Sequence, residues 1–279
     1  MSTLEHKPCN IETAGDTVRL VQITDTHLCA RSGGTLLAMD TDRSLQLVIQ
    51  QVLQERGTPD GLLCTGDLSD QGSLQAYLRL ITYLQEISAP DFWLPGNHDD
   101  LSEMQAAVGD SGRLQSELRG GNWQIILLNS QIPGEVGGEL GSDELERLSS
   151  ALGRAQAEGL HSLICLHHQP VAIGSAWIDQ QMVADAEQFW DIVDAASSVK
   201  GVLWGHVHQQ IDKRRGDIAL MASPSSCVQF APGSPAFKAD DKPPGYRWLD
   251  LCSDGSISTG VSRVTDADFT VDLDSGGYL

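Results

Sequence analysis

The residues best suited to chemistry in this sequence occur in five short segments, each directly after a run of apolar residues. The segments are Thr24-Asp25-Thr26-His27, Thr65-Gly66-Asp67, Pro95-Gly96-Asn97-His98-Asp99, His167-His168 and Gly205-His206-Val207-His208. Six of the eight histidines in the chain fall within these segments. Histidine, aspartate and asparagine side chains are ligands of metal ions in proteins. The repeated placement of these residue types after apolar runs predicts a metal centre.

Taken alone, each segment has an ordinary structural explanation. A single histidine that follows a strand is more often a hydrogen-bonded polar residue than a metal ligand. The Asp25-x-His27 pair is a weak signal by itself, and Gly205-His206-x-His208 is a moderate one. The recurrence of the same residue types after five separate apolar runs favours one shared site over five independent coincidences.

The number of donors indicates how many ions the site holds. The candidate ligands are Asp25, His27, Asp67, Asn97, His167, His206 and His208. These are too many for one tetrahedral or octahedral ion that keeps an open position. They suit two ions, about 3.5–4 Å apart, that share one carboxylate and one water. A mixture of oxygen and nitrogen donors without thiolate favours manganese, iron, zinc or cobalt over magnesium.

Hydrophobic patterning predicts the elements that must position these segments. Short apolar runs typical of buried strands span 18–23, 61–64, 92–94, 124–129, 163–166 and 202–204. Amphipathic stretches predict helices over 41–56, 73–87, 143–157 and 184–196. Alternating strands and helices form layered α/β domains, in which the carboxyl ends of the strands meet on one side and bind ligands. Strands expected at 217–222, 246–251 and 256–264 suggest an antiparallel sheet that completes the same domain.

The length of 279 residues fits one sizeable domain better than two. We therefore expect a single domain over residues 1–279. The polar residues 1–15 and the Asp- and Gly-rich residues 265–279 are candidates for flexible tails.

The five segments, in this order, resemble the motifs of the calcineurin-like metallophosphoesterase superfamily. The resemblance implies an α/β fold (α+β in some classifications) built as a four-layer αββα sandwich, with the active site at the carboxyl ends of the strands. It implies that Asp25, His27, Asp67 and His208 hold one metal ion. The second ion would be held by Asp67, Asn97, His167 and His206, so that Asp67 bridges the two. We expect iron, manganese or both, with zinc or cobalt as alternatives.

The resemblance also implies roles in catalysis. His98 would contact the substrate phosphate and protonate the leaving group, and Asp99 would fix the orientation of its ring. Substrate binding would involve Asn97, His98, His27, His208 and His168. For His168, contact with the substrate and a hydrogen bond that supports the ligands are equally open. The paired cations lower the pKa of the water they share, so that a bridging hydroxide attacks phosphorus in line with the leaving oxygen.

Over nearly its whole length the sequence also resembles the bacterial class III 3',5'-cyclic AMP phosphodiesterases. The resemblance is carried by residues 22–28, 93–99, 177–180, 205–209, 224–230 and 244–249. It implies a small cyclic nucleotide as partner and the hydrolysis of 3',5'-cyclic AMP to 5'-AMP. One alternative is a phosphodiesterase of broader specificity that acts on 2',3'-cyclic nucleotides or glycerophosphodiesters. Another is a non-catalytic, metal-binding regulatory protein.

Composition limits the kinds of molecule that the protein could bind and the cell compartment in which we expect it. The formal charge of −20 at pH 7 repels nucleic-acid polymers and anionic membrane surfaces, whereas bound cations reverse the local charge for a small anion. No apolar run approaches the roughly 20 residues that span a bilayer, and the N-terminal region does not resemble a signal peptide. Six scattered cysteines lack a C-x-x-C pair. We expect a cytoplasmic protein without nucleic-acid or membrane partners. The sequence does not determine the oligomeric state, and a homo-oligomer is possible.

Four further residues have two interpretations each. Trp177, Phe230 and Trp248 could stack on a nucleobase, but such residues are more often core or rim aromatics. Arg247 could meet a phosphate, or it could pair with one of the many acidic side chains.

Overall fold

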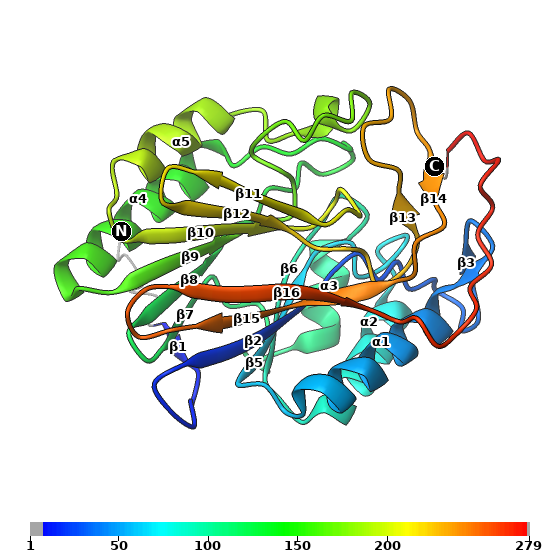
Figure 1. Ribbon diagram of the computed structural model, residues 1–279, viewed down its shortest axis with the longest axis horizontal. Helices are drawn as coiled ribbons and strands as arrows, with labels where there is room; N and C mark the ends of the chain where they lie inside the picture. Colours follow the sequence, from blue (N-terminus) through cyan, green and yellow to red (C-terminus); the bar gives the residue numbers. More distant parts are fainter. Residues whose placement is uncertain (1–7, 278–279) are drawn as a thin grey trace.

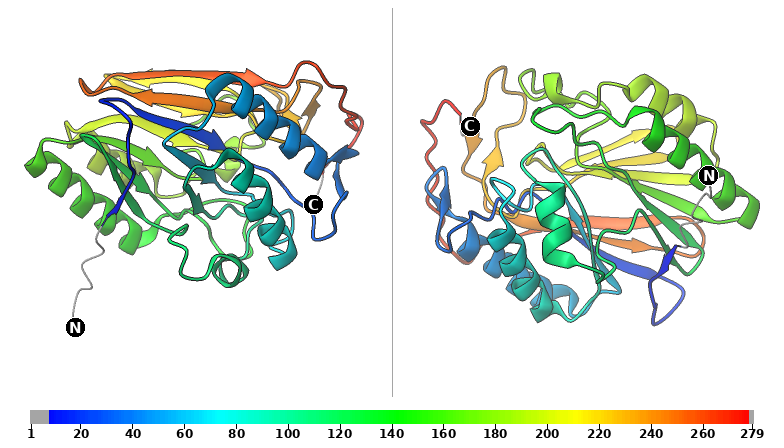
Figure 2. Two further views of the ribbon diagram at one scale, coloured as in Figure 1. Left: turned by 90° about the horizontal axis from the view of Figure 1, so that it is seen from below. Right: turned by 180° about the vertical axis from the view of Figure 1, so that it is seen from behind.

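The computed structural model describes residues 8–277, and its main strands form two sheets that lie face to face (Figures 1 and 2). The five-stranded sheet contains, in order, β16 (Ile257–Arg263), β15 (Gly245–Leu251), β2 (Val18–Ile23), β5 (Gly61–Thr65) and β6 (Asp91–Leu94). The seven-stranded sheet contains β1 (Cys9–Asn10), β7 (Glu117–Gly120), β8 (Trp123–Leu127), β9 (His161–Cys165), β10 (Val199–Trp204), β12 (Ile218–Ala222) and β11 (Ile211–Arg215).

Helices cover the outer face of each sheet. The five-stranded sheet carries α1 (Thr41–Arg56), α2 (Leu74–Leu84) with the 3-10 turn η1 (Gln85–Ile87), and α3 (Leu101–Val108). The seven-stranded sheet carries α4 (Gly141–Glu158) and α5 (Ala186–Asp194). Smaller elements are the hairpin of β3 (Thr35–Leu36) and β4 (Met39–Asp40), the pair β13 (Gln229–Phe230) and β14 (Ala239–Asp240), and the turn η2 (Asp179–Gln181). The result is the expected four-layer αββα sandwich.

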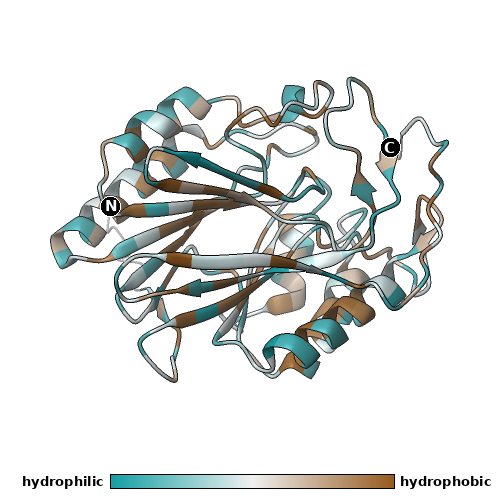
Figure 3. Cartoon of the chain, in the orientation of Figure 1, coloured by the Kyte–Doolittle hydropathy of each residue, from teal (hydrophilic) through white to brown (hydrophobic). Residues whose placement is uncertain are grey.

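Three apolar layers hold the sandwich together, and they explain why the central strands are largely apolar. Successive side chains of a strand point to opposite faces. Leu20 packs between the two sheets, whereas its neighbour Val21 packs under the helices. Leu163 and Ile164 of β9 divide in the same way. Because both faces are covered, neither needs polar residues, and Figure 3 shows apolar residues along the strands of both sheets.

The parallel strands determine where the site lies. In the five-stranded sheet, β2, β5 and β6 run parallel. In the seven-stranded sheet, β8, β9 and β10 run parallel. The loops that leave the carboxyl ends of these strands carry the five segments identified in the sequence. The fold thus gathers them at one edge of the sandwich.

Most of the predicted elements are present, and α1 has the predicted bounds. Of the three strands expected to form one antiparallel sheet after Gly216, β15 and β16 do pair antiparallel, but the assignment of the first strand to the same sheet is wrong. Strand β12 pairs in parallel with β10, whereas β15 lies antiparallel between β16 and β2 in the other sheet. Hydrophobic alternation identifies a strand but not its partner, which depends on long-range packing. The helix α3 and the strands β7 and β11 were not predicted.

Of the two candidate tails, residues 1–7 and 278–279 lie outside the described residues. Cys9 and Asn10 form β1, which pairs in parallel with β7. Near the other end, Phe269 and Val271 pack against a small cluster around Leu36, and the backbone N–H of Asp272 donates to the carbonyl of Leu37 at 2.8 Å. None of the helices between residues 8 and 277 is long and apolar enough to cross a membrane.

Candidate active site

The structure brings the seven candidate metal ligands together at one edge of the sandwich. Asp25 and His27 follow β2, Asp67 follows β5, Asn97 follows β6, His167 follows β9, and His206 and His208 follow β10. The aspartates and histidines among them are almost completely buried. Their ligand atoms form overlapping groups within 4.8 Å of one another. Burying so many charged and polar groups together costs free energy, and bound cations would offset that cost.

One half of the cluster contains Asp25, His27 and His208. The Nε2 atoms of the two histidines are 3.2 Å apart, and Nε2 of His208 lies 3.3 Å from Oδ1 of Asp25. Asp67 joins this half, since its Oδ2 lies 3.7 Å from Nε2 of His27. These four residues are the set that the family resemblance assigns to one ion.

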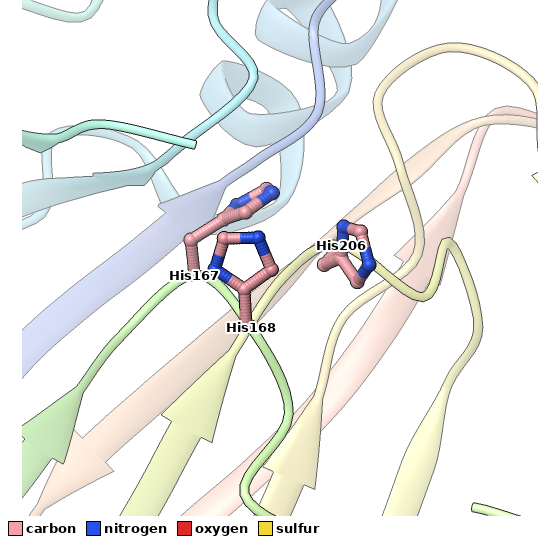
Figure 4. Close-up of side chains that lie close together, drawn as sticks. All are labelled: His167, His168 and His206. Atoms are coloured by element: carbon pink, nitrogen blue, oxygen red, sulfur yellow. The ribbon is translucent and has the colours of Figure 1, made fainter. Parts of the chain in front are cut away.

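The other half contains His167, Asn97 and His206 around the same carboxylate. Nε2 of His167 lies 3.3 Å from Oδ2 of Asp67 and 3.2 Å from Oδ1 of Asn97. The rings of His167 and His206 are 5.1 Å apart, and Figure 4 shows them converging from the loops after β9 and β10. Asp67 therefore contacts both halves, as a bridging carboxylate must.

The hydrogen bonds of the Nδ1 atoms determine which ring nitrogen of His167 and His208 faces the cluster. Nδ1 of His208 lies 2.7 Å from the carbonyl oxygen of Val228, and Nδ1 of His167 lies 2.8 Å from that of Thr65. A carbonyl only accepts, so each Nδ1 carries a proton, and Nε2 is the ring nitrogen that faces the cluster. Nε2 of His206 is buried without a hydrogen-bond partner among the described residues. Ring nitrogens that face inward, and one buried nitrogen without a partner, fit metal ions.

Backbone strain is concentrated at the same residues. Asp25, His27, Asp67, His206 and His208 have φ values of 53°, 44°, 51°, 63° and 48°. Residues other than glycine seldom occupy this left-handed region, and they do so where the surrounding structure holds them for a function. The strain turns these side chains out of the strand direction and into the cluster. No feature of the sequence indicated it.

Two glycines allow the loops to approach one another closely. A Cβ atom on Gly96 would lie 2.2 Å from Oδ1 of Asp67, and one on Gly205 would lie 2.3 Å from Oγ1 of Thr24. Neither residue has a positive φ. Their role is therefore close approach of the backbone rather than an unusual conformation.

His98 lies at the partly exposed rim of the cluster. Its backbone N–H donates to Oδ1 of Asp67 at 2.9 Å, and its Nδ1 lies 2.9 Å from the carbonyl oxygen of Asp70. Burial favours the neutral ring, but the negative charges of Asp67 and Asp70 outweigh it and raise the pKa of His98. The protein groups thus shift the His98 ring toward its protonated form.

The carboxylate of Asp99 ties two loops together. It accepts the backbone N–H groups of Leu68, Ser69 and Gly96 at 2.9–3.2 Å and the hydroxyl of Tyr77 at 2.9 Å. Burial and the nearby charge of Asp67 raise its pKa to about 6. The predicted role of Asp99 in orienting the His98 ring is not reflected in these hydrogen bonds, because the carbonyl of Asp70 engages the ring instead.

Asp70 is the site residue that the sequence reasoning missed. Besides the contact of its carbonyl with His98, its carboxylate Oδ1 lies 3.5 Å from Nδ1 of His27. A carboxylate behind a ligating histidine orients the ring and increases its basicity. The available signal was its position three residues after Asp67, which places it on the same loop.

His168 has partners within the protein on both ring nitrogens. Nδ1 lies 2.8 Å from Oγ of Ser130, and Nε2 lies 3.2 Å from the carbonyl oxygen of Val136. Burial and the neighbouring His167 lower its pKa to about 3, so the ring is neutral. These contacts favour the supporting interpretation, in which His168 ties down the loop between β8 and α4.

Phe230 and Arg247 are buried, whereas Trp177 and Trp248 are partly exposed and pack against the core. Phe230 stacks on the ring of His208 at 4.0 Å, and Trp177 packs edge-on against Phe230 at 5.2 Å. Trp248 lies beneath the guanidinium of Arg56 in α1, away from the cluster. Arg247 is buried and pairs with Asp212 at 2.9 Å.

The fold and the clustered ligands define the class of protein. The model of the calcineurin-like phosphoesterase family matches residues 18–210, which include all seven candidate ligands. The chain therefore belongs to the calcineurin-like phosphoesterase family, as the motifs predicted.

Comparison with curated proteins gives closer relatives. The chain is 44% identical to the 3',5'-cyclic adenosine monophosphate phosphodiesterase CpdA of Pseudomonas aeruginosa, over 96% of this chain and 98% of the relative. It is 38% identical to the enzyme of the same name from Escherichia coli K12, over 94% and 95% of the two chains. It is 37% identical to the 3',5'-cyclic-nucleotide phosphodiesterase alr5338 of Nostoc, over 88% and 92%. The resemblance to cyclic AMP phosphodiesterases is thus confirmed over almost the whole chain.

Solved structures share the fold at low sequence identity. A dimetal phosphatase from Danio rerio superposes with a TM-score of 0.59 at 15% identity, over 88% of this chain and 99% of that one. The purple acid phosphatase PPD1 from yellow lupin superposes with a TM-score of 0.63 at 13% identity, over 91% and 53%. These similarities confirm the predicted fold.

Proposed function

We propose that this protein hydrolyses 3',5'-cyclic AMP to 5'-AMP at a dinuclear metal centre. The observation that carries the proposal is the Asp67 carboxylate, which lies within 3.7 Å of histidines from both halves of one buried cluster, with His98 at the rim. The substrate is supported by the phosphodiesterase relatives at 37–44% identity, which match this chain along nearly its full length.

The residues fit two cations. Asp25, His27, Asp67 and His208 would hold one, and Asp67, Asn97, His167 and His206 would hold the other. This set without thiolate suits iron and manganese, with zinc or cobalt as alternatives. Such ions supply an ionised water at neutral pH and offset the negative charge of the phosphodiester. Metal analysis of protein purified without chelator tests this proposal. A single ion per chain, or none that resists dialysis, would contradict it.

His98 is the proposed general acid. Because its Nδ1 is engaged by the carbonyl of Asp70, the proton would leave from Nε2. Water adds its oxygen to phosphorus, the bond from phosphorus to O3' of the ribose breaks, and this proton passes to O3'. An alkoxide leaving group is strongly basic, so its departure depends on the proton. Asp67 fixes the position of His98 through the backbone N–H at 2.9 Å.

A product assay tests the activity directly. The purified protein is incubated with 3',5'-cyclic AMP and Mn²⁺ or Fe²⁺, with and without EDTA, and the products are separated chromatographically. Parallel reactions contain 2',3'-cyclic AMP and a nucleotide monoester. We expect EDTA-sensitive formation of 5'-AMP to be the fastest reaction. Faster cleavage of another ester would favour the alternative of broader specificity, and binding of two metal ions without any hydrolysis would favour a regulatory role.

We also propose a cytoplasmic location. All six cysteines are free, which suits a compartment that keeps thiols reduced. Fractionation of cells that express the protein tests this, and recovery from the periplasm would contradict it.

A further inference from the structure

The turn that carries Asn97 and His98 is held on its inner side by groups already described. The backbone N–H of His98 donates to Asp67, and that of Gly96 donates to Asp99 within the turn. The carbonyl groups of Gly96 and Asp99, which flank the two functional residues, also need partners. The carbonyl of Gly96 accepts the backbone N–H of Asp99 at 3.3 Å within the turn. Both carbonyls also meet Gln131, whose Nε2 lies 2.7 Å from the carbonyl oxygen of Gly96 and 2.5 Å from that of Asp99.

Gln131 reaches the turn from the opposite sheet. It follows β8 of the seven-stranded sheet, whereas the turn follows β6 of the five-stranded sheet. Its own backbone is anchored, because its N–H donates to Oδ1 of Asn129 at 2.9 Å and the residue forms a β-bridge with Gly138. A primary amide nitrogen has two N–H groups, which matches the two carbonyls on either side of His98.

We propose that Gln131 is a positioning residue that fixes the location of His98 for proton donation to the leaving group; the proposal rests on the function proposed above. Without its two N–H groups, the carbonyls of Gly96 and Asp99 would lose their link to the other sheet, and the turn would be held from its inner side alone. Proton transfer depends steeply on geometry, whereas Asp67 and the histidines of the cluster keep their own contacts.

Comparing substrates with different leaving groups distinguishes a role in positioning His98 from a general structural role. Gln131→Met keeps the length of the side chain and removes both donors. We expect kcat for 3',5'-cyclic AMP, which leaves as an alkoxide, to fall about tenfold or more with KM within about twofold. With bis(p-nitrophenyl) phosphate, which releases an anion that needs no proton, the rate should stay within about twofold. Both metal ions should be retained, and Gln156→Met on the exposed face of α4 should match the wild type in every assay.

Two results would overturn the proposal: an equal loss on both substrates, or no change on either. Loss of metal ions from Gln131→Met would also overturn the proposal, because Gln131 would then support metal binding and not the position of the proton donor. If the wild type does not cleave 3',5'-cyclic AMP, the proposed function fails independently. The positioning role is then judged from the ¹⁵N resonances of the His98 ring in the zinc-loaded protein. They should shift in Gln131→Met and not in Gln156→Met, and unchanged resonances would refute it.

Discussion

Gly96→Ala is the sharpest structural test of the site, because one methyl group is placed against the bridging carboxylate. The added Cβ would lie 2.2 Å from Oδ1 and 2.4 Å from the backbone nitrogen of Asp67, and 2.7 Å from Cε1 of His167. An ordinary contact is 3.4 Å or longer, so the loops must separate by about 1.2 Å. A rotamer change of Asp67 cannot relieve the clash, since its backbone is involved.

The expected magnitude follows from this displacement. A shift of about 1 Å in a catalytic constellation lowers the rate by about 100-fold, and overpacking of a buried site costs about 1–3 kcal/mol. For a chain of this length we expect the Tm to fall by about 2–5 °C. The measurements are thermal unfolding, metal content by mass spectrometry, and the rate of 3',5'-cyclic AMP hydrolysis, all on the same preparation.

Gly153→Ala is the matched control. Gly153 lies inside α4 with nothing within 4 Å of an added Cβ, so alanine should stabilise the helix by up to about 1 kcal/mol and leave activity unchanged. The reasoning about Gly96 is refuted if Gly96→Ala binds two metal ions per chain and turns over within threefold of the wild type.

Three further predictions concern the bridge, the general acid and the ion pair between the buried Arg247 and the half-exposed Asp212. Asp67→Ala should abolish binding of both metal ions and lower kcat by at least about 1,000-fold, and a variant with two tightly bound ions and near-normal turnover would exclude the bridging role. His98→Gln should slow 3',5'-cyclic AMP hydrolysis about 100-fold or more while sparing bis(p-nitrophenyl) phosphate, and equal losses would argue against general-acid catalysis. Burial opposes ionisation of Asp212, but the hydrogen bond from Arg247 outweighs it and lowers the pKa of Asp212 below its ordinary 3.8. The stabilisation by this carboxylate is therefore present above about pH 4 and is lost as the pH falls through the folded pKa. Asp212→Asn should cost about 1 kcal/mol at pH 7 and less near pH 3 in urea unfolding, and a constant difference would refute this.

The sequence was sufficient to predict most of the elements and the seven candidate ligands that the structure gathers in one cluster. Buried strands such as β2 and β9 are apolar on both faces, and α1 has a clear amphipathic period, so their local patterns are strong. The clustering of these candidate ligands was predictable because residue type and position after a strand are both local properties. Strand partners were not, and the three late strands were assigned to one sheet although β12 joins a different sheet from β15 and β16.

The roles of supporting residues were decided by tertiary contacts alone. The same histidine dipeptide contains a ring that faces the cluster, His167, and a ring whose nitrogens are both engaged by protein groups, His168. Nothing in their spacing distinguishes them, since the difference comes from the loop that packs over His168. Gln131 acts on a turn that is 35 residues away in the chain. The sequence by itself therefore determined which atoms are available to bind metal ions, whereas the packing of two sheets determined which loops meet and which side chains hold them in place.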